Sequence, residues 1–167
     1  MCEIIDEKTK VCDPDEYSQS KMLAENLLNE CNFCTLVLRV PAVLGKGAPT
    51  SWPVCLRKEY SVNSSVNLYN KNNKYNHCIH IHSLAEFIFS KKLLKEEFEK
   101  ELLILSAQIP ISIEKCAELL LGSDAPNILQ KNNGRNSPVI NPKKAIFKYA
   151  YKPWTVAKTL KQYVKQE

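Results

Sequence analysis

A tyrosine and a lysine four positions apart are the residues of this chain whose types and spacing best suit chemistry. Tyr17 and Lys21 lie in the stretch DPDEYSQSKMLAENLL, and an i, i+4 pair shares one face of a helix. A free tyrosine titrates near pH ~10, and a neighbouring ammonium favours the phenolate. A phenol activated in this way can give a proton to a carbonyl oxygen or take one from a hydroxyl. The spacing by itself is weak evidence, because Y-x-x-x-K also occurs by chance as a packed ring beside a solvated lysine.

A helix over residues 14–30 must position this pair. Asp13 is a suitable cap and Pro14 suits the first turn, and several apolar residues supply one face of the helix. The next segment, residues 35–40 (TLVLRV), is short, branched and almost uniformly apolar, and residues 101–106 (ELLILS) repeat the pattern. Such runs are typical of strands covered on both faces of a parallel sheet.

The remaining segments alternate between helix and strand patterns. The polar stretch NSSVNLYNKNNKYN indicates a hairpin or short strands, HCIHIH indicates a short strand, and residues 123–142 look like a loop. Ser83 and Glu86 form a capping-box pattern at the start of a helix. A later helix, SIEKCAELLLG, ends at Gly122, and Thr155 is a suitable cap for the last one. The alternation predicts an α/β fold.

Length and composition describe an ordinary globular protein. With 167 residues, 44% of them hydrophobic and 25% charged, residues 1–167 are expected to form a single domain. No apolar run approaches the roughly 20 residues that span a bilayer, and the start of the chain has no signal-peptide pattern. Seven cysteines at irregular spacing are then expected to be reduced thiols, which predicts a cytoplasmic location and no membrane partner.

The positive charge is unevenly distributed. The net charge is +5, and from Lys131 onward nine lysines or arginines face one acidic residue. A basic segment can bind nucleic acid. The lysines are scattered, however, and no RNA-binding aromatic motif accompanies them, so nucleic-acid binding is not favoured.

Three motifs in order along the chain resemble the extended short-chain dehydrogenase/reductase family, the NAD-dependent epimerases and dehydratases of nucleotide sugars. YSQSKMLAENLL is similar to the family's Y-x-x-S-K-x-x-x-E helix, CTLVLRVPAVLGKG to its L-R-x-x-x-V-x-G strand and loop, and NHCIHIHSLAEFI to its H-V-D-D-L segment. ISIEKCAELL and AYKPW also look like its C-terminal region. The resemblance implies a partial Rossmann-like fold: the C-terminal half of a doubly wound parallel sheet, with a small substrate-side region at about 45–82 and 107–167.

The resemblance also implies roles for particular residues. Tyr17 matches the catalytic acid/base, and Lys21 matches the lysine that binds the nicotinamide ribose and lowers the pKa of the tyrosine. Pro41, Ala42 and Val43 match the loop that borders the nicotinamide. The implied cofactor is NAD or NADP, and the implied substrate is a nucleotide sugar or a related carbohydrate. Epimerase, dehydratase and reductase chemistry all remain open, as does a non-catalytic binding or scaffold role.

Several departures from the family pattern limit this implication. The four glycines, at 45, 47, 122 and 134, do not form the glycine-rich turn that holds a pyrophosphate, and no convincing catalytic Ser or Thr precedes Tyr17. Ala42 replaces an asparagine, Asn76 replaces an arginine, and His82 and Ser83 replace two aspartates. We therefore expect the chain to be incomplete without an N-terminal cofactor-binding half, which can lie on another chain, and we expect it to self-associate, for example as a homodimer.

A zinc site is the alternative hypothesis to a catalytic tyrosine–lysine pair. Cys31 and Cys34 form a C-x-x-C pair, and further candidate ligands are His77, Cys78, His80 and His82. A second tight pair is absent. The sequence therefore predicts no metal.

Overall fold

The computed structural model describes residues 4–95, 99–122, 128–131 and 137–166 of the chain. Its helices are α1 (Glu16–Glu30), α2 (Trp52–Asn63), α3 (Ile81–Ile88), α4 (Lys91–Lys95), α5 (Ile113–Leu121), α6 (Lys143–Tyr149) and α7 (Val156–Gln166). Its strands are β1 (Ile4–Ile5), β2 (Thr35–Arg39), β3 (Ala42–Leu44), β4 (Val66–Tyr69), β5 (Lys74–Tyr75), β6 (Cys78–His80), β7 (Lys100–Ile104), β8 (Ile111–Ser112), β9 (Ile128–Lys131) and β10 (Val139–Ile140). The chain is therefore mixed α/β, as the sequence predicts.

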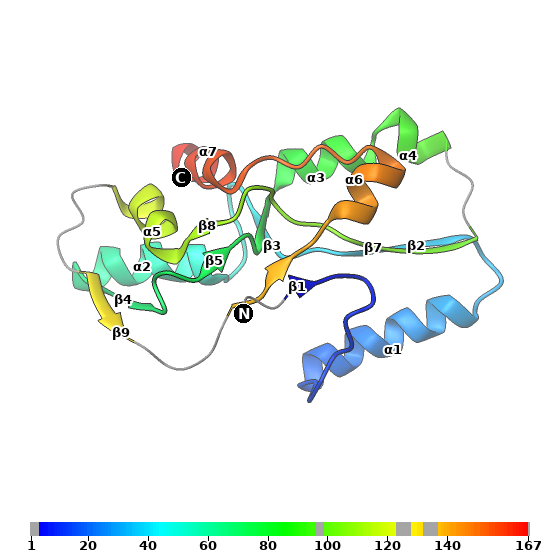
Figure 1. Ribbon diagram of the computed structural model, residues 1–167, viewed down its shortest axis with the longest axis horizontal. Helices are drawn as coiled ribbons and strands as arrows, with labels where there is room; N and C mark the ends of the chain where they lie inside the picture. Colours follow the sequence, from blue (N-terminus) through cyan, green and yellow to red (C-terminus); the bar gives the residue numbers. More distant parts are fainter. Residues whose placement is uncertain (1–3, 96–98, 123–127, 132–136, 167) are drawn as a thin grey trace.

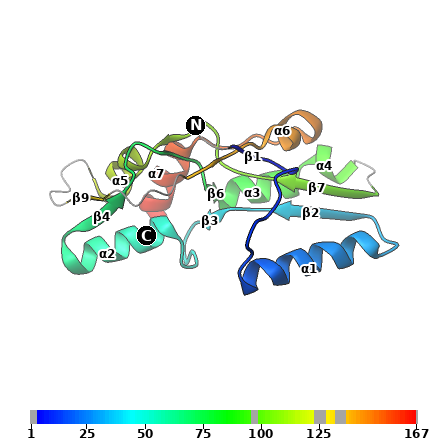
Figure 2. The same ribbon diagram turned by 60° about the horizontal axis from the view of Figure 1, so that its bottom comes forward.

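The pair of strands β2 and β7 lies between two layers of helices. The strands are parallel, with Thr35 opposite Lys100 and Arg39 opposite Ile104. Helix α1 lies on one side of the pair, and α3 and α6 lie on the other (Figures 1 and 2). Because side chains alternate along a strand, Leu36 and Leu38 pack toward α3 and α6, whereas Arg39 faces α1.

The two strands confirm the prediction of a parallel pair, but they are less covered than expected. Every residue of β2 is only half-buried. In the described chain β2 pairs with β7 alone, so its other edge is open. The other strands form small pairs: β1 with β10, β3 with β6 and β4 with β9 are parallel, and β5 with β8 is antiparallel. The doubly wound sheet implied by the resemblance is not seen in these two-stranded pairs.

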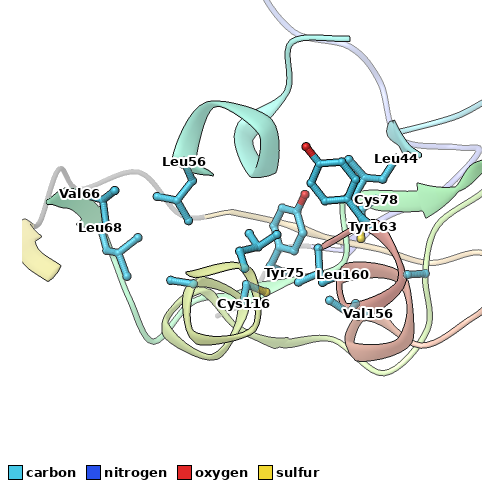
Figure 3. Close-up of a cluster of buried hydrophobic side chains, with 13 residues drawn as sticks. Leu44, Leu56, Val66, Leu68, Tyr75, Cys78, Cys116, Val156, Leu160 and Tyr163 are labelled. Carbon is cyan, nitrogen blue, oxygen red and sulfur yellow. The ribbon is translucent and has the colours of Figure 1, made fainter. Parts of the chain in front are cut away.

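Two clusters of buried side chains hold the elements together. The first cluster joins α2, α5 and α7 to β3, β4 and β6, and is drawn in Figure 3; its largest members include Leu44, Leu68, Leu160 and Tyr163. The second packs α3 and α6 on β7, with Leu103, Leu105 and Tyr149 fully buried. Together the clusters connect the β2–β7 pair to α2, α5 and α7.

Several element boundaries differ from the sequence predictions. Asp15, rather than Asp13, caps α1, because its carboxylate accepts a 2.8 Å bond from the amide of Ser18. His80, rather than Ser83, caps α3, and the helix begins at Ile81. The polar stretch after α2 forms short strands but no hairpin, because β4 pairs with β9 and β5 with β8.

Other predicted elements are confirmed, and some elements were missed. Helix α5 ends at Gly122, whose φ is +96°, and Thr155 accepts a 3.1 Å bond from the amide of Lys158 at the start of α7. Helices α2 and α6 were not predicted. Part of the predicted loop 123–142 lies outside the described residues, and the rest contains β9 and β10. No helix in the described part of the chain is long and apolar enough to cross a membrane.

A cluster of charged and hydroxyl groups around Glu101 fastens α6 to β7. Its carboxylate accepts hydrogen bonds from Lys144, from Lys148 at 2.6 Å and from the hydroxyl of Tyr149. Lys144 also donates to the carbonyl of Leu102 at 2.9 Å. Burial raises the pKa of Glu101, but these hydrogen bonds outweigh burial and lower that pKa to about 2.

The low pKa of Glu101 predicts an acid-sensitive attachment of α6. A carboxyl group with a depressed folded-state pKa stabilises the fold above its unfolded-state pKa of about 4.5, and this stabilisation is lost as the pH falls toward 2. We expect Glu101→Gln to lower the free energy of unfolding by about 1–2 kcal/mol at pH 7 and by much less near pH 3. Urea unfolding of both proteins across this range measures the difference. Glu114→Gln, which breaks the more exposed pair with Lys71, is the control and should change little; an equal Glu101 effect at both pH values would contradict the assignment.

Candidate active site

Tyr17 and Lys21 lie beside a hollow between α1 and the end of β2. The hollow has a volume of about 670 Å³ and is lined by Tyr17, Lys21, Val40 and Ile104, among others. Residues of the N-terminal segment, including Thr9, Lys10 and Val11, line it as well. In α/β sheets, ligands bind in crevices at the carboxyl ends of strands, and Val40 directly follows β2.

The predicted pair shares one face of α1. The ammonium of Lys21 lies 5.2 Å from the centre of the Tyr17 ring, within the range of a cation–π contact. The side chain of Tyr17 is 69% exposed, and α1 contains no buried residue. The helix therefore presents the phenol to the hollow and to solvent, rather than to a core.

A charged fork holds α1 against β2. Arg39 donates from Nε to Glu25 Oε1 at 2.8 Å and from Nη2 to Glu25 Oε2 at 2.6 Å. The hydrogen bonds lower the pKa of Glu25 and raise that of Arg39. Bidentate arginine–carboxylate pairs fix geometry as well as adding energy. Because Glu25 is one helical turn after Lys21, the fork sets the position of the catalytic candidates over the hollow.

Breaking the fork should loosen α1. We expect Glu25→Gln to lower the free energy of unfolding by about 1 kcal/mol, since the pair is only partly exposed. Chemical denaturation measures this loss, and a double-mutant cycle with Arg39→Lys isolates the coupling between the two side chains. Glu16→Gln, in the exposed first turn of the same helix, serves as the control. Additive effects of the two fork variants would show that the fork contributes nothing.

A second hollow adjoins the first. It has a volume of about 460 Å³ and is lined by two of the predicted loop residues, Pro41 and Ala42, together with Trp52, Tyr75 and His77. Both hollows share four lining residues: Ile5, Arg39, Val40 and Ile104. The third predicted loop residue, Val43, packs instead against the second buried cluster. The structure thus brings Tyr17, Lys21, Pro41 and Ala42 around two adjoining hollows.

Asn76, at the position that the sequence resemblance matches to an arginine, is a buried clamp. Its side chain is 2% exposed. Its amide nitrogen donates to Ser106 Oγ at 3.1 Å, to the carbonyl of Ala107 at 3.2 Å and to that of Ile140 at 2.7 Å, and its amide oxygen accepts from the Ile140 amide at 3.0 Å. These bonds hold β10 and the segment after β7 beside the second hollow.

The three histidines of the zinc hypothesis and Cys78 make structural contacts, whereas Cys34 is exposed. His80 is fully buried, stacks on Trp154 with ring centres 4.8 Å apart, and bonds to Gln166 at 3.1 Å. Burial lowers its pKa, and the thiol of Cys78 is buried with a raised pKa. Among the described residues, no group of three or more His, Cys, Asp or Glu side chains is placed to hold a metal ion.

The glycines of the loop GKGAPT serve packing and turning. A Cβ at Gly45 would lie 2.7 Å from Ile81 Cγ2, and Gly47 has a φ of +74°. Neither glycine begins a helix that could hold a pyrophosphate, because α2 starts at Trp52. The described glycines therefore form no cradle for the phosphates of a dinucleotide.

The sequence predicted no role for Glu25, Arg39, Trp52 or Tyr75, and it offered His77 only as a candidate metal ligand. Glu25 is the glutamate of the pattern Y-x-x-x-K-x-x-x-E, so a sequence signal for this residue was present, although its pairing with Arg39 was not predicted. The aromatic residues come from segments distant in sequence, and only the fold brings them together.

No protein-family model and no curated protein matches the chain. Solved structures do match. The UDP-glucuronic acid 4-epimerase of Bacillus cereus in complex with NAD matches with a TM-score of 0.77 and 15% identity over 99% of this chain and 55% of that one. The dTDP-glucose 4,6-dehydratase of Bacillus anthracis in complex with NAD matches with a TM-score of 0.71 and 17% identity, and the match covers 95% of this chain and 54% of that one. RMD from Pseudomonas aeruginosa complexed with NADPH matches with a TM-score of 0.74 and 16% identity, and the match covers 97% of this chain and 59% of that one.

The chain spans little more than half the length of these solved structures. Two of these neighbours are named as an epimerase and a dehydratase, and all three structures contain NAD or NADPH. At these identities the likeness establishes the fold: the chain has the fold of about half of such a Rossmann-like enzyme.

Proposed function

We propose that this chain is the C-terminal part of an NAD(P)-dependent epimerase, dehydratase or reductase that acts on a nucleotide sugar or related carbohydrate. The observation that carries the proposal is the placement of Tyr17 and Lys21 on one face of α1, beside a hollow at the carboxyl end of β2. A nicotinamide cofactor, when bound, would supply the hydride transfer. The protein supplies orientation and proton handling.

In this proposal Tyr17 is the proton-transfer group. Its phenol opens on the hollow, where it can hold a proton for a substrate oxygen. Lys21 provides positive charge 5.2 Å from the ring centre and an ammonium that can bond to a ribose. Pro41 and Ala42 line the adjoining hollow at the start of β3, and their backbone would border the nicotinamide, whereas the next predicted residue, Val43, packs against the second buried cluster.

The exposed apolar surface of α1 supports the proposal that another domain or chain covers this helix. Leu23 and Leu27 are about 60% exposed, and Phe33, just after the helix, is 77% exposed. Strand β2, which begins two residues after Phe33, pairs with β7 alone in the described part of the chain. Exposed apolar faces and unpaired edges are usually covered in the functional protein. The proposal assigns this surface to an N-terminal cofactor-binding half, on the same or another chain, or to a second copy.

The alternatives receive less support. A non-catalytic binding protein of the same fold would not need the paired phenol and ammonium at the hollow. Nucleic-acid binding needs an open basic patch, whereas Lys144 and Lys148, two of the lysines in the basic C-terminal part, bond to Glu101.

The chain alone should bind dinucleotides poorly. The phosphate cradle that supplies most of the binding in this type of fold is not among its residues. We expect no saturable heat in calorimetric titrations with NAD or NADP at micromolar concentrations. An affinity in the micromolar range would contradict the proposed division into halves and would point to a cofactor site within this chain.

A further inference from the structure

We infer that Cys31 and Cys34 form a redox-active dithiol, which a small-molecule disulfide such as glutathione disulfide converts reversibly into an intramolecular disulfide bond. The two cysteines are the ends of the C-x-x-C sequence that joins α1 to β2, and both are free thiols. Neither cysteine lines either of the two hollows. The inference therefore goes beyond the proposed function and does not depend on it.

The turn between α1 and β2 places the two cysteines at its ends. The chain bends over residues 31–33 and reverses its direction, so that β2 runs back along α1 (Figure 2). Cys31 ends the helix, with its amide donating to the carbonyl of Leu27 at 3.1 Å, and Cys34 directly precedes β2. When a chain turns back over four residues, the first and fourth Cα atoms lie within about 7 Å of each other, which is about the greatest separation that a disulfide spans.

The side chain of Cys31 already points into this turn. Its thiol donates to the carbonyl of Leu28 at 3.0 Å, and its sulfur lies 3.9 Å from the carbonyl oxygen of Phe33. That carbonyl belongs to the peptide bond that Phe33 forms with Cys34. The sulfur of Cys31 is therefore next to the backbone of its partner, and rotation of the exposed Cys34 side chain about χ1 brings the second sulfur toward the first.

The different exposure of the two thiols sets the order of the reaction. Cys34 is exposed and Cys31 is half-buried, so the Cys34 thiolate attacks one sulfur of glutathione disulfide first, which gives a mixed disulfide and releases one glutathione. The Cys31 thiolate then attacks the sulfur of Cys34, and the second glutathione leaves. The two cysteines lose two electrons and two protons in total. Both pass to glutathione disulfide, which becomes two molecules of glutathione.

Metal binding and core packing are less well supported as uses of this pair. A structural zinc site takes four ligands, and no group of three or more His, Cys, Asp or Glu side chains in the described part of the chain is placed to hold a metal ion. Cys78 and Cys116, by contrast with the pair, are buried in the first cluster, and burial raises the pKa of both thiols. Those two cysteines should therefore not react.

The disulfide would fix the end of the helix that carries the candidate catalytic pair. Helix α1 contains no buried residue, and polar contacts attach it to the strands, among them the Glu25–Arg39 fork and a hydrogen bond from Lys100 to the carbonyl of Asn29. A covalent bond across the turn restricts the unfolded chain more than the folded one, in which the turn is already formed. By linkage, the fold should favour formation of the disulfide.

The test equilibrates the full chain with mixtures of glutathione and glutathione disulfide, then alkylates the remaining thiols and digests the protein with trypsin. Cleavage after Lys21 and Arg39 releases residues 22–39, which contain Cys31, Cys34 and no other cysteine. We expect this peptide to carry no alkyl group and to be two hydrogen atoms lighter than its reduced form. The same yield in urea-unfolded chain should need about tenfold more glutathione disulfide.

Matched variants assign the bond to this pair. Cys31→Ser and Cys34→Ser should each abolish the internal disulfide, and Cys31→Ser should leave the mixed disulfide with glutathione on Cys34. Cys55→Ser, which removes an exposed cysteine of α2, should change neither the yield nor the glutathione ratio at which the bond forms.

Three results would overturn the inference. One is a wild-type peptide that carries glutathione on Cys34 while Cys31 remains alkylated. Another is a disulfide that joins Cys34 of two chains, which a non-reducing gel separates from the monomer. The third is an internal disulfide that forms as readily in urea as in the folded chain, because the fold would then contribute nothing to it. Turnover that depends on Tyr17 is measured separately, so neither result decides the other.

Discussion

Replacing Tyr17 by phenylalanine should reduce turnover by about 10²–10⁴-fold once the chain is combined with a dinucleotide-binding half. The substitution keeps the ring, and therefore its cation–π contact with Lys21, but removes the proton that the mechanism moves. General acid–base groups typically contribute a factor of this size. Steady-state assays with a nicotinamide cofactor and a nucleotide sugar measure the loss.

The control for Tyr17→Phe is Tyr69→Phe. Tyr69 is also an exposed tyrosine, at 44%, but it lies on β4, away from both hollows. It should leave turnover unchanged. Because Tyr17 packs in no core, its replacement should not alter the free energy of unfolding by more than about 0.5 kcal/mol. If Tyr17→Phe kept wild-type turnover, Tyr17 and Lys21 would be only an aromatic ring beside a surface charge, and the proposed role of Tyr17 in proton transfer would be wrong.

Replacing Asn76 by leucine should destabilise the fold by about 3–5 kcal/mol. The amide side chain makes four hydrogen bonds inside the protein, two of them to Ile140 in β10. Leucine has a similar volume but leaves buried backbone groups without partners, and each such group costs about 1–3 kcal/mol. Domains are typically stable by only about 5–15 kcal/mol, so the variant should unfold at a much lower urea concentration.

The matched control for the clamp is Asn72→Leu. Asn72 lies four residues earlier and is exposed, so its replacement should cost less than about 0.5 kcal/mol. If Asn76→Leu lowered the free energy of unfolding by less than about 1 kcal/mol, the hydrogen bonds of the clamp would not be needed for stability.

Local sequence signals predicted those parts of the fold that depend on neighbouring residues. The apolar runs of β2 and β7 predict a parallel pair, because strands of parallel sheets lack polar alternation, although β2 is only half-buried. Gly122 and Thr155 mark helix ends through backbone freedom and side-chain capping, which act within a few residues. The placement of Tyr17 and Lys21 on one face likewise follows from helical periodicity alone.

Features that depend on distant partners were not predictable in the same way. Asp13 and Asp15 are equally good caps by residue type, and only the backbone path decides: Asp13 adopts a φ of +46°, and Asp15 meets the amide of Ser18. Ser83 matches a capping box, but the chain enters α3 earlier, with His80 as its cap. The contact between the Trp52 and Tyr75 rings depends on packing between α2 and β5, which no local pattern predicts.

The measurement that tests the central claim most directly is the absorbance of reduced nicotinamide. The chain, joined to a half with a glycine-rich turn, is loaded with NAD and mixed with UDP-glucose, UDP-glucuronic acid or dTDP-glucose. We predict that at least one of these nucleotide sugars produces reduced nicotinamide in the wild type and in Tyr69→Phe, and that Tyr17→Phe suppresses it. A folded, NAD-loaded wild-type protein that reduces no cofactor with any of them would contradict the proposed function.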